Sequence, residues 1–117
     1  MLAEIRPFGM PIHPRRFTAD RVREALLELA QGHATILAHA EKSWASVTFA
    51  GARHRLELLF DGAAAVEAGE LFIALLPEHE FDILGQLVAD AAVTEVDHRL
   101  DPPRMMVRCE LLLLEDG

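Results

Sequence analysis

The chain contains a single cysteine, no tyrosine, no asparagine and no long apolar run among its 117 residues. One cysteine cannot form a disulfide within the chain, which favours a reducing, cytoplasmic setting. No stretch approaches the roughly 20 apolar residues that cross a bilayer, and the N-terminus lacks the pattern of a signal peptide. We therefore expect a cytoplasmic protein that does not enter membranes. Ten arginines against one lysine fit the codon usage of a GC-rich bacterial genome.

Positive charge is also scarce. The 11 Lys and Arg residues are outnumbered by 19 Asp and Glu residues, which leaves a net charge of −8. Such a chain repels a phosphate backbone, so we do not expect a nucleic-acid partner. The sequence has no glycine-rich phosphate loop, no Gly-x-Ser-x-Gly elbow and no His-Glu-x-x-His pair. These absences predict no cofactor, and they leave any small-molecule ligand unknown.

What the sequence does contain is strong periodicity. Its 51% apolar residues allow one domain with a real core and leave room for an oligomer interface. Residues 1–17 carry three prolines and predict an extended N-terminal arm, followed by a single domain over 18–117. A helix is expected over 19–31, because Thr18 suits the N-cap, apolar residues recur at helical spacing, and Gly32 suits the C′ position.

Two hairpins are predicted after this helix. A first strand over 34–41 leads into a second, and residues 50–53 match a two-residue turn with glycine in first place. That turn sets His54 opposite Phe49 and sorts both strands into one apolar and one polar face. The second hairpin joins a strand over 87–100 to the terminal strand through Asp101-Pro102-Pro103, and its register sets Glu95 opposite Arg108.

The terminal strand has the clearest pattern in the chain. One side is wholly apolar, as expected of a strand with one face in the core. We expect Cys109, which lies on that side, to be a small buried hydrophobic residue rather than a nucleophile. The apolar side consists of Met105, Val107, Cys109, Leu111 and Leu113.

These elements predict an α+β fold: a two-layer sandwich in which two helices cover an antiparallel sheet of about five strands, in the order α-β-β-β-α-β-β. The second helix is expected over 63–76 and ends before Pro77; the alternative is a helix to Ala68 and a strand from Glu70. The uncovered sheet face is more apolar than a wet face requires, which favours a homo-oligomer formed through that face or through the arm. Its apolar residues are Trp44, Leu59, Met106, Leu112 and Leu114.

Several residues are candidates for chemistry. The loop residues Glu78, His79, Glu80 and Asp82 combine carboxylates and an imidazole, which are ligands for divalent metals. Asp90 falls among apolar neighbours in the predicted register, and a carboxylate in such surroundings is a site candidate. His98 lies near the last turn and completes the acid-base set. His54 is expected to be a capping or core histidine, and His39 lies on the first strand.

Two hypotheses follow. The first is a non-catalytic module that self-associates through its sheet face or its N-terminal arm. The second is a small enzyme or a ligand or metal binder that uses His79 and Asp90, with His98, as acid-base groups or ligands. The sequence favours the first hypothesis, because the apolar open face extends over several strands whereas the candidate ligands match no spaced motif.

Overall fold

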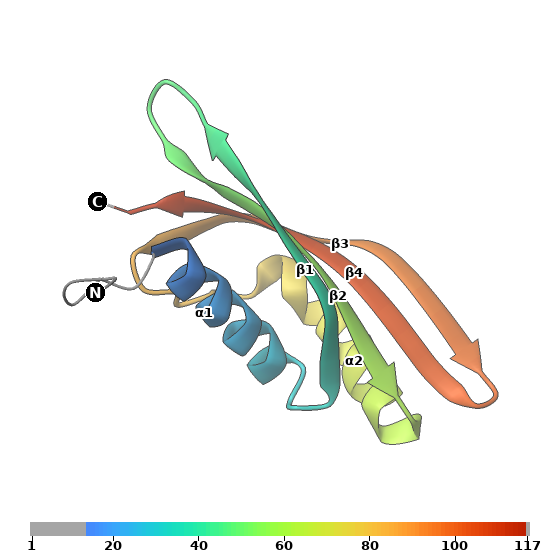
Figure 1. Cartoon of the computed structure of the whole chain (residues 1–117). Helices are drawn as coiled ribbons and strands as arrows, with labels where there is room; N and C mark the ends of the chain where they lie inside the picture. Colours follow the sequence, from blue (N-terminus) through green and yellow to red (C-terminus); the bar gives the residue numbers. More distant parts are fainter. Residues whose placement is uncertain (1–13, 117) are drawn as a thin grey trace, which may run out of the picture.

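The computed structural model describes residues 14–116, which form one antiparallel sheet covered on one face by two helices (Figure 1). The sheet has the strand order β1-β2-β4-β3, so β1 and β3 are its edges. The predicted α+β class is confirmed, but there are four strands instead of five. The elements are α1 (Pro14–Leu29), β1 (Ala34–Ala45), β2 (Ala50–Asp61), α2 (Ala63–Leu75), the 3-10 helix η1 (Leu76–Glu78), β3 (Gln86–Leu100) and β4 (Pro103–Glu115).

Helix α1 begins earlier than predicted. Its first residue is Pro14, which suits the first turn because an N–H there would have no partner within the helix. Thr18 therefore lies inside the helix and is not its N-cap. Residues 14–17 of the expected arm are helical, and the remainder of that arm, residues 1–13, lies outside the described residues.

The C-terminal end of α1 shows why Gly32 is not the C′ residue. The Gly32 N–H donates to the Leu27 carbonyl and the Gln31 N–H donates to the Glu28 carbonyl, both at 2.9 Å. This pair of bonds is a Schellman motif, in which the left-handed C′ residue is Gln31, with a φ of 58°. Gly32 follows it as C″.

The first hairpin turns at residues 46–49, and the predicted turn at 50–53 is wrong. Ala45 pairs with Ala50, so the predicted strand over 34–41 and the strand after it are one strand, β1. The true register differs from the predicted one by an even number of residues. Because side chains alternate with a period of two, the predicted faces of β2 are nevertheless right, and His54 and Leu56 face the helices. Val47 and Phe49, which were expected on the same apolar face, are exposed in the turn.

Gly51, which suggested the turn, has a different role within β2. It pairs with Leu114 on one side and Trp44 on the other. An ideal Cβ on Gly51 would lie 1.9 Å from the carbonyl oxygen of Leu113. The glycine is therefore required by close approach of the neighbouring strand and not by a turn.

The second hairpin confirms the predicted register only near its turn. Glu95 faces Arg108 as expected, but register shifts at Ala89 and Thr94 displace the rest of β3. Ala92 consequently faces Glu110 and not Leu111. Each β-bulge inserts one unpaired residue and moves the following side chains to the other face. Asp90 is thereby moved away from the apolar face that the sequence predicted for it.

The core lies between the helices and the covered sheet face. The apolar side of β4 is buried as predicted, with each of its residues at most 1% exposed. Burying one such side chain contributes about 1.5–3 kcal/mol. Helix α2 confirms the single predicted helix over 63–76 and packs closely on the sheet, because an ideal Cβ on Gly69 would lie only 2.5 Å from Met105. Neither described helix is long and apolar enough to span a membrane.

We predict that Gly51→Ala lowers the free energy of unfolding by about 2 kcal/mol, because the new methyl group meets backbone that no rotamer change relieves. Chemical denaturation of dilute protein measures the loss. Ala50→Ser, an exposed change one residue away, is the matched control and is expected to stay within about 0.5 kcal/mol of the wild type. Equal denaturation midpoints for Gly51→Ala and the wild type would contradict this role of Gly51.

Candidate functional site

The sheet face that carries no helix is the main candidate surface, and we call it the open face (Figure 1). The side chains of β2 and β4 alternate across the sheet, so the residues between the buried ones lie on this face. All five apolar residues predicted for it lie there, with Leu114 buried and the others half-buried. They are Trp44, Leu59, Met106, Leu112 and Leu114.

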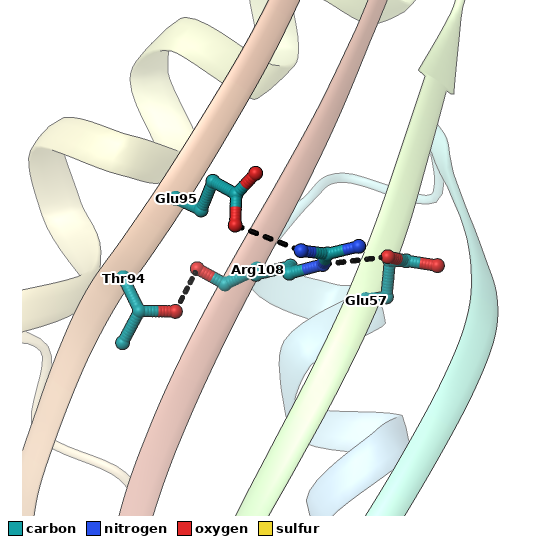
Figure 2. Close-up of polar contacts among 4 residues, drawn as sticks. All are labelled: Glu57, Thr94, Glu95 and Arg108. Atoms are coloured by element: carbon teal, nitrogen blue, oxygen red, sulfur yellow. Dashed lines mark hydrogen bonds and ion pairs between the residues drawn. The ribbon is translucent and has the colours of Figure 1, made fainter.

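The centre of the open face is an ion-pair network around Arg108. Its guanidinium donates to Glu57 on β2 and to Glu95 on β3 (Figure 2). Both hydrogen bonds are 2.7 Å long. The three residues pair directly across neighbouring strands, which places their side chains side by side. Thr94, the unpaired residue of the second bulge, donates its hydroxyl to the Arg108 carbonyl at 3.2 Å. The bulge residue is thus bonded to the backbone of the strand that carries Arg108.

This network determines where positive and negative charges lie on the open face, and it contributes little to the stability of the fold. Hydrogen bonds to Glu57 and Glu95 raise the pKa of Arg108, so its charge is permanent. The Arg108 side chain is nevertheless half exposed, and solvent-exposed ion pairs contribute little to stability. A second ion pair lies beside this network, where Arg53 contacts Glu110 at 3.3 Å. Charges of both signs therefore alternate over the middle of the face.

The open face is hollowed in several places, and two of its hollows bear on function. The central hollow, of about 470 Å³, lies over the Arg108 network and is bordered on β1 by the small residues Ala38 and Ala40. The second, which we call the end hollow, has a volume of about 390 Å³ and lies beside the β3–β4 turn. Four apolar and four charged residues line the end hollow: Leu37, Leu59, Pro102 and Met106, with Asp97, Arg99, Asp101 and Arg104.

A chain of hydrogen bonds lies on the opposite, helix-covered face. Arg23 of α1 donates to His39 Nδ1 at 2.8 Å, and His39 Nε2 lies 2.9 Å from His54 Nδ1. An arginine only donates, so His39 Nδ1 must accept, and His39 donates from Nε2. His54 then accepts at Nδ1 and carries its own proton on Nε2, which is buried without a partner within the described chain.

Both histidines are held neutral by their surroundings. Burial, together with the neighbouring His54 and Arg23, lowers the pKa of His39 from 6.5 to about 4. Burial and Arg23 also lower the pKa of His54. A charge on either ring would oppose the Arg23 guanidinium, so the cluster links α1 to the sheet only while both rings are uncharged.

The predicted metal ligands are not gathered into a site. Glu78, His79, Glu80 and Asp82 all lie exposed after α2, and the His79 ring packs edge-on against Phe81 with centroids 4.6 Å apart. Over residues 14–116, no three His, Cys, Asp or Glu side chains are placed to hold a metal ion. The loop thus has suitable ligand types without the convergence that coordination needs.

Asp90 and His98 lie too far apart to act on one substrate. Both belong to β3, and eight residues of strand separate them by about 25 Å. Asp90 pairs with Leu112 and His98 pairs with Met105, residues of β4 that point to opposite faces. Neither side chain borders the central hollow or the end hollow.

Cys109 is buried as expected. Its side chain is 1% exposed, and burial raises the pKa of its thiol to about 12. A thiol that stays protonated is a poor nucleophile, so Cys109 serves packing.

Sequence reasoning missed the Arg23–His39–His54 cluster. It placed His54 on the apolar face, which is right, but the hairpin register separated His54 from His39. The true register sets His39 opposite Leu56 and therefore diagonally next to His54. The available signal was the presence of two histidines on the apolar side of adjacent strands. The helix expected to cover that side carries Arg21 and Arg23 between its apolar residues.

Comparison with known proteins adds a likeness in fold. No family model matches the sequence, and no curated protein matches it. A solved chain from the "Virion of native gene transfer agent (GTA) particle" superposes with a TM-score of 0.50. The two chains are 12% identical, and the match covers 89% of this chain and 95% of that chain. At this identity the likeness shows a shared fold.

We predict that acid destabilises the protein through the histidine cluster. Because folding lowers the pKa of His39 from 6.5 to about 4, the unfolded chain binds protons first, and stability is lost as the pH falls from 6.5 towards 4. Above pH 6.5 this contribution is fully present. Denaturation midpoints across this range measure the effect. His39→Gln, which cannot be protonated, is expected to flatten the slope, and an unchanged slope in that variant would contradict the assignment.

Proposed function

We propose that this protein is a non-catalytic module that self-associates and so serves as a building block of an assembly. The observation that carries the proposal is the open face, where half-buried apolar residues and paired charges of both signs lie uncovered. Such a mixture suits a surface that another protein covers, since interfaces combine apolar area with satisfied polar groups.

Charge pattern supports a second copy of the same chain as the partner. The protein has a net charge of −8, so two copies repel each other at a distance. The open face is an exception, because Arg53, Arg55 and Arg108 balance Glu57, Glu95 and Glu110 on it. Identical copies therefore meet least repulsion where their open faces are brought near each other.

The likeness to a chain of a virion particle agrees with this proposal, since a virion is itself an assembly of proteins. The alternative, a small enzyme or metal binder based on His79 and Asp90, is not favoured by any contact in the described chain. His79 lies in an exposed loop, and Asp90 lies on the open face opposite Leu112.

Sedimentation velocity of the full chain tests the proposal. We expect the mean mass to exceed the 13.0 kDa of one chain and to rise with concentration at tens of micromolar. His79→Ala is a matched control, because it removes the catalytic candidate and is expected to leave the mass distribution unchanged. A mass of 13.0 kDa throughout the concentration series would rule the proposal out.

A further inference from the structure

The tip of the β1–β2 hairpin is an uncovered apolar protrusion. Val47 is fully exposed and Phe49 is 48% exposed. The last pair that β2 makes with β4 is Gly51 with Leu114, so residues 45–50 extend beyond the rest of the sheet (Figure 1). Exposed apolar residues at a free hairpin tip are unfavourable in water, and they are typical of a segment that contacts a partner.

The composition of the tip lowers the cost of burying it. Residues 43–52 contain no charged side chain, in a sequence of which 26% is charged. Partner binding at this segment therefore removes no charge of its own from water. In protein interfaces the fully buried centre is likewise depleted of charged residues, whereas the rim keeps them.

The turn is also organised in advance. The Ser46 hydroxyl accepts the N–H groups of Thr48 at 3.3 Å and Phe49 at 3.1 Å, and the Ser46 N–H donates to the Phe49 carbonyl at 2.7 Å. These turn amides have partners within the hairpin, so burying the turn leaves none of them unsatisfied. A turn that is already ordered loses little further entropy on binding.

The end hollow has the complementary features. Its apolar residues include Leu37, which is 50% exposed, and its four charged residues supply the polar rim that an interface needs. Its volume of about 390 Å³ accommodates a valine and an aromatic side chain. The hollow lies at the opposite end of the open face from the tip, about 30 Å along β2, so a copy cannot fill its own hollow.

Resting on the proposed self-association, we infer that the hairpin tip of one copy docks into the end hollow of the next copy. The contact is heterologous, because different surfaces of the two copies meet. A docked pair still has one free tip and one free hollow, so the contact repeats head to tail into a ring or a filament. The neighbour's hairpin then lies along the open face, which extends the contact beyond the tip itself.

Three substitutions test this contact by sedimentation velocity. Val47→Asp puts a charge on the tip, and Leu37→Asp puts one in the end hollow. Both positions are at least half exposed, so the monomer fold is expected to survive, and circular dichroism checks it. Each change is expected to weaken assembly at least about tenfold. Leu84→Asp, at a 72% exposed position in the loop before β3, is the matched control and is expected to assemble like the wild type.

The outcomes separate the inference from the proposed function. If the wild type assembles and Val47→Asp or Leu37→Asp assembles equally well, the docking contact is wrong while self-association stands. If the wild type sediments as a monomer, self-association fails and the docking contact fails with it. If Leu84→Asp also disrupts assembly, the effect is one of added charge, and the assignment to tip and hollow is overturned.

Discussion

Burial of one side of β4 is the constraint on which the rest of the structure depends. Met105, Val107, Cys109, Leu111 and Leu113 are each at most 1% exposed beneath the two helices. A strand places alternate residues on opposite faces, so this burial fixes what the other side presents. Because β4 lies between β2 and β3, it also fixes which residues of those strands stand beside Arg108. The ion-pair network, the central hollow and the end hollow follow from that placement.

The two ends of the open face differ for reasons that lie in the chain connections. At one end β1 and β2 continue past the last β2–β4 pair and carry an uncharged turn. At the other end the tight β3–β4 turn brings Pro102 and four charged residues around a hollow. Unlike ends and a charge-balanced middle are the features that the proposed head-to-tail contact requires. The histidine cluster lies on the covered face and belongs to folding, not to this contact.

The sequence predicted the layers and the faces better than the pairing. The period of two in β4 and the helical stripes of α1 and α2 are local patterns, and they were sufficient for the α+β class. The hairpin register failed because Gly51 was interpreted as a turn residue, whereas close approach of Leu113 explains it. Asp90 was misplaced because β-bulges at Ala89 and Thr94 have no signature in the side-chain pattern. The sequence predicted the apolar residues of the open face correctly. The end hollow and the protruding tip of the β1–β2 hairpin depend on the strand order, which the periodicity of the sequence does not determine.

A mixing experiment tests the head-to-tail account most directly. Val47→Asp copies lack a competent tip and keep the hollow, while Leu37→Asp copies lack a competent hollow and keep the tip. Neither variant alone is expected to assemble, but the mixture has one matching pair of ends. The account predicts a one-to-one complex with twice the 13.0 kDa mass of the chain and nothing larger. A mixture in which both variants remain monomeric would contradict it.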